Sequence, residues 1–524
     1  MLKLVLGASG SGKTTLLYAR IRARAEAGKR SILLVPEQFT SSTEARIYRE
    51  LGDALSGMVE SYSFTSLAEH ILAVEGGAAV QTLTDAGRAV LVRRALEELQ
   101  DNVHYYYRHR RSAAFCQMAA ETIDELKSAG LSGQQLQELA RDCGTESAKL
   151  GELALIFQGY ESLLAGTGMD PADRLELAAD RLEAALARDE LPDFLREREV
   201  FIDEFDTFNA PKKRLMGAML AALPAVTVAL CEDGAPMQPG DLELFSGAKQ
   251  VAAQLRQLAR KNGAQVAAPE LLRRDLRHKD APGLAALTEL LETGSCTPPE
   301  SAPELRLFAA ASREEEARCA AAAIRRLMRQ GVRCGKIAVV CRDISLYRAA
   351  VRYEFRMAEI PLYCDEPTTP EFSAPATAVR ALLALLRGAD MTEQLTVLAK
   401  TGLCALTEPE VCALENYAYT WSPNAAAWRA EFTKSPRGFG DAELTEEDTQ
   451  NLTRAENARK KLVTAVDTLR SRVRSANAEQ ISRALYFCLK ELGAEEQQAA
   501  QVEDIRTARG IPAAEEAARE WNVV

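Results

Sequence analysis

The chain has 524 residues, of which 47% are hydrophobic and 27% are charged, and its formal net charge is -11 at pH 7. Domains typically hold about 100–200 residues, so this length predicts three or four of them, and the composition is that of a soluble globular protein. No stretch approaches the roughly 18 apolar residues of a membrane span, and the eleven cysteines lack metal-binding spacings, which predicts reduced thiols in a cytoplasmic protein.

The first elements alternate between strand and helix. A short apolar strand, LKLVLG, runs into a Gly/Ser loop and then into a helix predicted from about Lys13 to Ala27. A second apolar strand, RSILLV, ends before Pro36. This alternation predicts a parallel α/β sheet. No signal peptide is expected, because the first apolar run passes directly into the loop.

Apolar residues then recur at helical spacing from about Leu83 to Leu191. Strand patterns return in REVFIDEF and AVTVALCED, and they predict that the same sheet is completed after a helical insert.

A polar stretch with several prolines, ETGSCTPPESAPELRL, predicts a domain boundary. Beyond it, the strand ELRLFAA, a helix that begins REEEARC and the strand KIAVVCRD predict a second α/β unit. From about Pro370 onward the pattern is helical again.

The loop after the first strand, GASGSGKT, fits G-x-x-x-x-G-K-[ST] without a gap. Its glycines let backbone N–H groups converge on phosphate oxygens, Lys13 reaches the β- and γ-phosphates, and the Thr14 hydroxyl binds Mg²⁺. A Gly-rich turn without a ligand is the alternative, but the strand before the loop and the helix after it favour a nucleotide site. The predicted ATP-binding residues are Gly7, Ala8, Ser9, Gly10, Ser11, Gly12, Lys13, Thr14 and Thr15.

A P-loop also needs a carboxylate from a neighbouring strand to hold the metal, and VFIDEF supplies an acidic pair at a strand end. Asp203 is predicted to bind Mg²⁺ together with Thr14, and Glu204 is the predicted catalytic residue that orients or deprotonates the attacking water. A solvated strand end is the alternative. The separation of about 190 residues from the loop suits a P-loop core with a large helical insert.

Several further segments occur in order over nearly the whole chain. The segments are LLVPEQFTSSTEARI, VESYSFTSLAEHIL, YYYRHRRSAAFCQMAAETIDELKSAG, FIDEFDTFNAPKKRLM, AAIRRLMRQGVRCGKIAVVCRD, IPLYCDEPTT and AREWNV. Together with the P-loop they make the chain resemble the UvrD-like superfamily 1 helicases and, more narrowly, the AddB-type subunit of AddAB (RexAB-like) ATP-dependent helicase–nucleases.

The resemblance implies an α/β fold of RecA-like P-loop NTPase domains with large helical insertions. It assigns 1–82 and 192–295 to a first RecA-like domain (1A), 83–191 to a helical insertion (1B), 303–370 to the start of a second RecA-like domain (2A) and 371–524 to a second helical insertion (2B). The family's C-terminal nuclease domain, with its four-cysteine 4Fe-4S cluster, is expected to lie outside this chain, which would then be a fragment or a truncated reading frame.

The resemblance also implies a function. The chain would be an ATP- and Mg²⁺-binding subunit of a heterodimeric helicase/exonuclease that processes DNA double-strand breaks for homologous recombination repair. Its partners would be an AddA-type subunit and single- and double-stranded DNA ends, which it scans for a hotspot sequence, while the 5'-3' exonuclease lies in the absent region. A nucleotide-binding scaffold without motor or nuclease activity is the alternative. A P-loop kinase is disfavoured because the chain shows no plausible acceptor site, and a transporter ATPase because it shows no LSGGQ-like signature between the loop and Asp203.

Two loops match single-stranded DNA contacts of such motors by position and resemblance, PEQFTSS and SYSFTS. The hydroxyls of Thr40, Ser63 and Thr65 suit phosphate oxygens, whereas Phe39 and Phe64 either stack on bases or pack in the core.

A third candidate DNA contact is HYYYRHRR, in which aromatic rings alternate with the guanidinium groups of Arg108, Arg110 and Arg111. The alternative is a helix that packs its tyrosines and exposes its arginines. By resemblance, Arg342 would be a catalytic arginine against the γ-phosphate, although an arginine at a strand end is more often in a surface salt bridge. No catalytic role is expected for His70 or His278.

Overall fold

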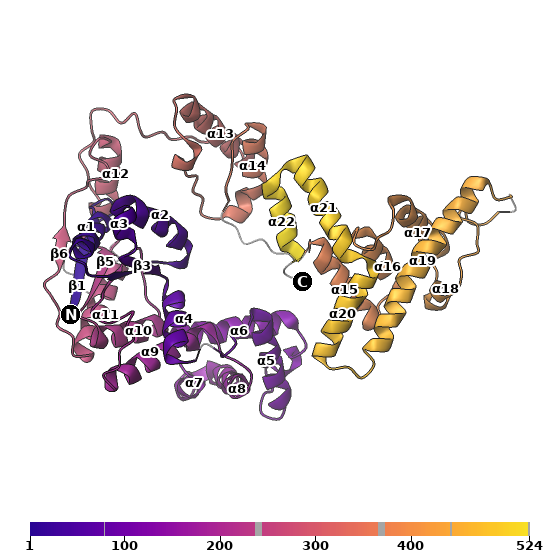
Figure 1. The fold of residues 1–524 in the computed structure, drawn as a ribbon, viewed down its shortest axis with the longest axis horizontal. Helices are drawn as coiled ribbons and strands as arrows, with labels where there is room; N and C mark the ends of the chain where they lie inside the picture. The colour runs from indigo at the N-terminus through magenta and orange to yellow at the C-terminus, as the bar shows by residue number, and fades with distance from the viewer. Residues whose placement is uncertain (78, 236–243, 365–371, 441–442, 522–524) are drawn as a thin grey trace. The chain divides into compact units, whose positions relative to one another are not determined.

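The computed structural model describes residues 1–77, 79–235, 244–364, 372–440 and 443–521. It divides into two compact units, Met1–Ala309 and Ala310–Val524 (Figure 1). Each unit is described by itself, and the division of the chain into four parts stays a prediction.

The first unit is built on a six-stranded sheet in the order β3-β2-β4-β5-β1-β6, with parallel pairing throughout. This confirms the predicted α/β fold, including the return of the chain to the same sheet after the helical insert. The strands are β1 Leu2–Gly7, β2 Ser31–Leu34, β3 Val59–Tyr62, β4 Glu199–Ile202, β5 Ala225–Cys231 and β6 Glu270–Leu272.

Helices cover both faces of this sheet, which explains why its strands are nearly continuous apolar runs. Alternate side chains of one strand enter different cores: Leu4 and Leu6 pack against α4, α9, α10 and α11, whereas Val5 packs against α1, α2 and α3. The bounds are α1 Lys13–Glu26, α2 Thr40–Leu51, α3 Asp53–Ser56, α4 Phe64–Glu75, α9 Pro171–Ala187, α10 Ala210–Ala222, α11 Ser246–Lys261 and α12 Pro282–Thr293.

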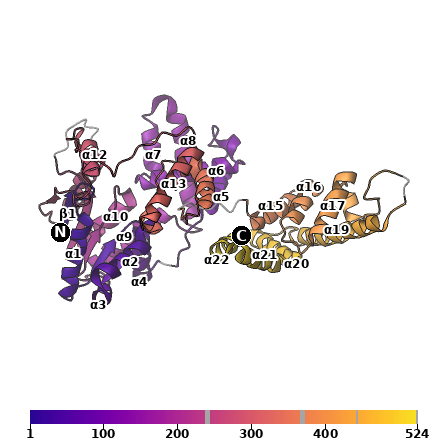
Figure 2. The same ribbon diagram turned by 90° about the horizontal axis from the view of Figure 1, so that it is seen from above.

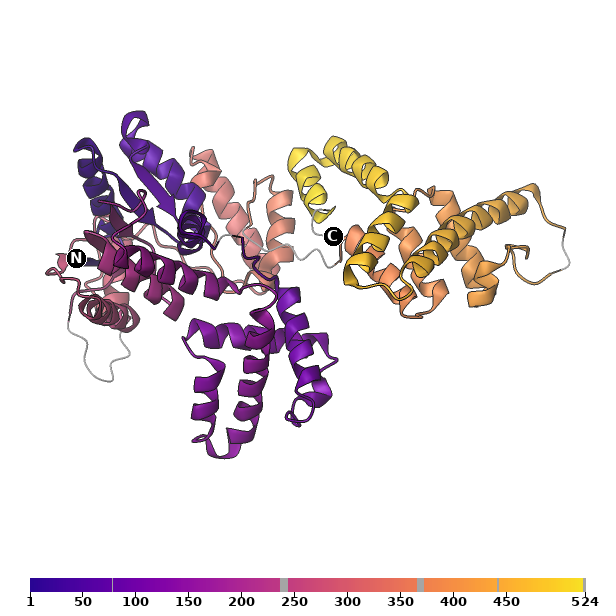
Figure 3. The ribbon, with the colours of Figure 1, turned by 60° about the horizontal axis from the view of Figure 1, so that its bottom comes forward.

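The helices predicted between about Leu83 and Leu191 are present, and four of them gather beside the sheet around a core of their own (Figure 3). The last helix of the stretch, α9, packs instead into the core beneath the sheet. The insert therefore reaches back onto the sheet with its final helix. The four helices are α5 Asp85–Glu98, α6 Ala113–Ser128, α7 Gly133–Ala140 and α8 Ser147–Leu164.

A buried polar network joins these helices to α9. The Lys127 ammonium lies 2.8 Å from Asp170 Oδ2 and 2.9 Å from Asp173 Oδ2, and the Tyr160 hydroxyl donates to Asp170 Oδ1 at 2.7 Å. Tyr160 and Asp170 are each only 1% exposed. Burial lowers the pKa of Lys127, but hydrogen bonds to the two aspartates outweigh it and raise that pKa overall.

The second unit is helical over its described residues. α13 and α14 form a small pair packed through Ala321, Ile324 and Phe355, while α15 to α21 (Figure 2) share a larger core that includes the fully buried Trp428. The bounds are α13 Arg313–Arg329, α14 Ile344–Met357, α15 Ala374–Leu386, α16 Met391–Lys400, α17 Glu408–Trp421, α18 Ala425–Arg429, α19 Glu446–Arg472, α20 Ala478–Leu492, α21 Ala494–Arg509 and α22 Ile511–Trp521.

Two predicted strands are wrong, one at residues 304–310, where the first unit ends, and one at residues 336–343 in the second unit. ELRLFAA and KIAVVCRD contain no strand, although the helix predicted between them is present as α13. Leu307 is 98% exposed and Val340 is 91% exposed, because no described strand lies beside them to pair with the backbone and cover the apolar side chains. Parts of IPLYCDEPTT and AREWNV lie outside the described residues.

Within the described ranges, no helix combines the length and the apolar character that crossing a bilayer requires. All eleven cysteines are unpaired.

Replacing Lys127 by Met should lower the free energy of unfolding by about 3 kcal/mol, because it leaves two carboxylates facing a buried site without their cation. Tyr160→Phe should cost about 1–2 kcal/mol through one lost hydrogen bond to a charged group. Chemical denaturation monitored by circular dichroism measures both. Lys149→Met, which removes an exposed ion pair with Glu146, is the control and should change stability by less than about 1 kcal/mol. A Lys127→Met effect no larger than that of the control would contradict the structural role of the network.

Candidate nucleotide-binding site

The sheet brings the P-loop and the acidic pair to one edge. β5 pairs with β1 on one side and with β4 on the other, so Gly7 and Asp203 follow two strands that are separated by a single strand. With about 4.8 Å between neighbouring strands, the two backbones lie roughly 10 Å apart. That gap accommodates phosphate groups and a metal ion.

The P-loop forms a cradle that only glycine permits. Gly10 and Gly12 have φ angles of 80° and 92°, in the left-handed region. A Cβ atom on Gly7 would come within 2.4 Å of Ser11 Oγ and 2.7 Å of the Leu272 carbonyl oxygen. The Ser11 hydroxyl oxygen is buried without a hydrogen-bond partner in the described structure. The cradle therefore fits the close approach of a phosphate to backbone N–H groups.

Lys13 and Asp203 line the same cavity, which has a volume of about 460 Å³ and also contacts Thr14 and Thr15. The Lys13 ammonium donates to the carbonyl oxygens of Gly7 at 2.7 Å and Ala8 at 2.8 Å. Burial lowers the pKa of Lys13, and the nearby Asp203 carboxylate partly opposes this shift. The Lys13 ammonium and the Asp203 carboxylate thus face one cavity, while their roles at a triphosphate and its metal stay a prediction.

Asp203 is only 5% exposed, and burial raises the pKa of its carboxyl group. Hydrogen bonds from Thr14 and from the Glu204 backbone N–H, at 3.0 Å, oppose that shift. Glu204 itself has a φ of 66°, which is unusual for a residue with a side chain. Burial and the adjacent Asp203 raise the pKa of Glu204, which favours a carboxylate able to accept a proton.

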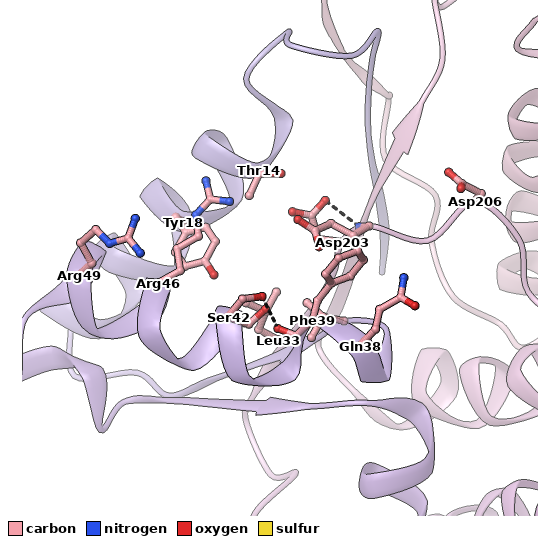
Figure 4. Close-up of a pocket in the computed structure, with 13 residues that line it drawn as sticks. Thr14, Tyr18, Leu33, Gln38, Phe39, Ser42, Arg46, Arg49, Asp203 and Asp206 are labelled. Atoms are coloured by element: carbon pink, nitrogen blue, oxygen red, sulfur yellow. Dashed lines mark hydrogen bonds between the residues drawn. The ribbon is translucent and has the colours of Figure 1, made fainter. Parts of the chain in front are cut away.

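A second hollow, of about 570 Å³, adjoins the first (Figure 4). Both hollows are lined by Thr14, Asp203, Glu204 and Arg46, so they meet at the predicted metal site. The Arg46 guanidinium, on α2, lies 4.8 Å from the centre of the Tyr18 ring, on α1. Arg46 therefore adds a positive charge on the α2 side of the acidic pair.

The chain after β6 crosses the P-loop from the other side. The Leu276 backbone N–H donates to the Gly10 carbonyl oxygen at 3.0 Å, and the Arg277 guanidinium donates to Ser9 Oγ at 3.2 Å. Asp275 Oδ1 accepts the backbone N–H of Arg277 at 2.9 Å and so fixes the turn. Arg277 lines the 460 Å³ cavity beside Lys13 and supplies another cation at the phosphate site.

The predicted DNA-contacting residues of the first unit have different environments. Phe39 lines the 570 Å³ hollow, and Thr40 Oγ1 donates to the Glu37 carbonyl oxygen at 2.8 Å at the start of α2. Ser63 is buried as the cap of α4, and Phe64 is 2% exposed in the core, whereas Thr65 is exposed.

In the HYYYRHRR segment, Arg108 and Arg111 are exposed. The Arg110 side chain already makes contacts within the protein. Its guanidinium lies 3.8 Å from the centre of the Tyr107 ring and donates to the Tyr107 carbonyl oxygen at 3.1 Å. Arg342 is exposed in the second unit and follows a segment without strand structure. The role predicted for it at the γ-phosphate stays a prediction.

Sequence reasoning missed Arg46 and Arg277. A signal for Arg46 exists, because Phe39, Ser42, Arg46 and Arg49 follow one another at helical spacing directly after a strand end. For Arg277 the only local signal is a cation shortly after the short apolar run at β6.

Comparison with known proteins gives one consistent result. The profile of a family described as "ADDB, N-terminal" matches residues 4–288. The chain is 30% identical over 550 residues to the B subunit of the ATP-dependent helicase/deoxyribonuclease of Moorella thermoacetica, covering 99% of this chain and 46% of that protein. The proteins of the same name in Desulforudis audaxviator and Clostridium acetobutylicum are 30% and 25% identical over 94% and 100% of this chain. The chain spans about half the length of the curated relatives it matches.

Replacing Asp203 by Asn should stabilise the protein without nucleotide while weakening Mg²⁺-dependent nucleotide binding. Folding raises the pKa of Asp203, so the ionised carboxylate destabilises the folded state relative to the protonated carboxyl group. The free energy of unfolding therefore falls as pH rises from about 4 through the raised pKa. The variant should therefore match the parent protein near pH 4 and exceed its Tm near pH 8 by roughly 2 °C, which corresponds to about 1 kcal/mol. Thermal unfolding across this pH range measures the difference. A lower Tm for the variant at pH 8 would show that attraction to Lys13 outweighs burial.

Proposed function

The chain belongs to the ADDB N-terminal family, and on that premise we propose that it is the ATP-binding portion of the B subunit of an ATP-dependent helicase/deoxyribonuclease. The observation that carries the proposal is the single cavity shared by Lys13, Thr14 and Asp203. A triphosphate with its metal satisfies the buried ammonium and the buried carboxylate at once.

Each side chain has a role in this proposal. The backbone N–H groups of the P-loop and the Lys13 ammonium would bind the phosphates, and Thr14 with Asp203 would hold Mg²⁺, which would supply positive charge to offset the negative charge of the phosphates. Glu204 takes a proton from the attacking water, because its raised pKa brings its basicity closer to neutral pH. Arg46 and Arg277 stabilise the negative charge that develops on the transferred phosphoryl group.

The finer functional assignment is part of the same proposal. The protein would work with an AddA-type partner on the ends of DNA double-strand breaks for recombinational repair and would scan the DNA for a hotspot sequence. Among the DNA contacts predicted in the first unit, Thr65, Arg108 and Arg111 are exposed and suit contacts with phosphates. The exonuclease would belong to the part of the relatives that this chain does not span.

A nucleotide-binding scaffold is the second candidate function. It is favoured by the hydrogen bonds from Leu276 and Arg277 to the P-loop, which fix the loop from outside. A fixed loop suits a nucleotide that is held rather than turned over.

Lys13→Ala should abolish measurable ATP hydrolysis by this chain in the presence of DNA, because the ammonium at the β- and γ-phosphates is lost. Arg46→Ala should lower the turnover rate by about 10–100-fold and change nucleotide affinity by less than threefold, since its charge acts on the transition state. A phosphate-release assay and fluorescent ATP titration measure the two quantities separately.

The matched control is Arg22→Ala, which removes an exposed arginine of α1 on the helix that carries Lys13, and it should retain both properties. Equal, negligible hydrolysis by the parent protein and by Lys13→Ala, with tight ATP binding by the parent alone, would favour the scaffold. If Lys13→Ala bound ATP as tightly as the Arg22→Ala control does, the proposed nucleotide site would be disproved.

A further inference from the structure

Positive charge is concentrated in one part of the second unit. Residues 457–487, which form the last part of α19 and the first part of α20, contain seven Lys or Arg and two acidic residues. The following residues, 488–520, contain four Lys or Arg and eight acidic residues. A chain with a net charge of -11 therefore carries a local surplus of five positive charges over these 31 residues, and such a patch attracts polyanions.

Five polar side chains of α19 lie on one face of the helix. Asn457, Lys460, Thr464, Thr468 and Ser471 follow one another at spacings of three or four residues. They line two neighbouring hollows of about 480 Å³ and 500 Å³, both of which contact Lys460 and Thr464. At 1.5 Å per residue this row is about 21 Å long, which spans at most about six nucleotides at 3.4 Å each.

The cations around this row are held in place by different partners. The Arg429 guanidinium lies 3.0 Å from Asp467 Oδ1, and that of Arg472 lies 2.7 Å from Glu491 Oε1. Lys460 is exposed and has no ion pair within the described residues. It is therefore the cation most available for a phosphate oxygen, with the hydroxyl of Thr464 one turn away.

Two exposed aromatic rings lie on α20, and one of them shares a hollow with the last residue of α19. A hollow of about 350 Å³ is lined by Arg472, Gln480, Arg483 and Phe487. Phe487 is 45% exposed and Tyr486 is 54% exposed, whereas Cys488 and Leu489, which follow directly, are buried in the core. The Arg472 guanidinium lies 5.9 Å from the centre of the Phe487 ring.

We propose that this α19–α20 surface, formed by Asn457, Lys460, Thr464, Thr468, Ser471, Arg472, Arg474, Arg483 and Phe487, binds single-stranded DNA. The proposal rests on the proposed function, since it assigns a DNA contact to the same subunit. Cations and hydroxyls along α19 suit the phosphate backbone. Exposed aromatic rings beside guanidinium groups suit stacking on unpaired bases, which a duplex does not offer.

The first experiment neutralises the cations in the full chain. Lys460→Ala/Arg472→Ala/Arg474→Ala should weaken binding of a fluorescein-labelled 20-nucleotide single strand by at least tenfold at 100 mM KCl, measured by anisotropy. The slope of log K against log salt should fall by about two, because each lost phosphate contact on a single strand contributes about 0.7.

The matched control removes three exposed arginines from the acidic segment, Arg506→Ala/Arg509→Ala/Arg519→Ala, and should change affinity by less than twofold. It has the same change in net charge. Equal weakening by both triple variants, or no weakening by the first, would overturn the proposal and leave the surface to a protein partner or to solvent.

The second experiment tests the aromatic ring. Phe487→Ala should weaken single-strand binding by about 5–100-fold, which is the effect of losing one stacked base, and should change binding of a 20-base-pair duplex by less than twofold. Tyr419→Ala, which removes an 88% exposed ring of α17, is the control and should leave both affinities unchanged. Equal losses for the single strand and the duplex would overturn the single-strand assignment.

A separate measurement distinguishes this proposal from the proposed function. The variants of the α19–α20 surface should bind ATP as tightly as the parent protein does. In the absence of ATP, Lys13→Ala should bind the single strand with the affinity of the parent protein. If the parent protein failed to bind ATP while the first triple variant still weakened DNA binding, the nucleotide site would be disproved and the α19–α20 surface would remain assigned to DNA.

Discussion

The candidate site depends on the position of β5 between β1 and β4. In a parallel sheet all carboxyl ends lie at one edge, so a loop and a carboxylate about 190 residues apart in the sequence meet there. The single intervening strand sets their separation at roughly 10 Å, which is wide enough for phosphates and a metal. The helical insert lies between β3 and β4. The chain leaves the sheet through α4 and returns through α9, and both helices contribute to the same apolar core, so the length of the insert does not disturb the sheet.

The same arrangement buries opposite charges before a ligand binds. Lys13 has a lowered pKa and Asp203 has a raised pKa, and burial is the main cause of both shifts. Carbonyl oxygens of the P-loop partly satisfy the ammonium, and Thr14 and a backbone N–H partly satisfy the carboxylate. Charges held in this way would need little reorganisation on binding a triphosphate, as the proposed function requires. The left-handed backbone at Glu204 is strain of the kind found next to such sites.

The parts of the candidate site that the sequence can predict are those encoded locally. Spacing alone predicts the P-loop from Gly7 to Thr14, and an apolar run followed by acids predicts a role for Asp203, because each pattern lies within one strand and its following loop. Arg46 and Arg277 reach the cavity from α2 and from the turn after β6, so their roles depend on packing that no short pattern records. For the same reason Phe64 was considered for base stacking, whereas the fold uses it as a buried contact for Phe205 and Phe208.

Strand propensity misleads at residues 304–310 and 336–343, and net charge misleads in the second unit, for related reasons. ELRLFAA and KIAVVCRD have the composition of strands, but a strand needs a hydrogen-bonded neighbour to be stable, and none is described beside them. The strand propensity of a segment therefore predicts a strand only when a neighbouring strand is present to pair with it. The net charge of the whole chain misleads in another way, because it averages over all surfaces of the protein. The positive charge of residues 457–487 is offset by the negative charge of residues 488–520, which follow them in sequence. Recognition of a polyanion depends on the local field within about 10 Å, the screening length at 0.1 M salt, so the basic face of α19 acts on DNA independently of a net charge of -11.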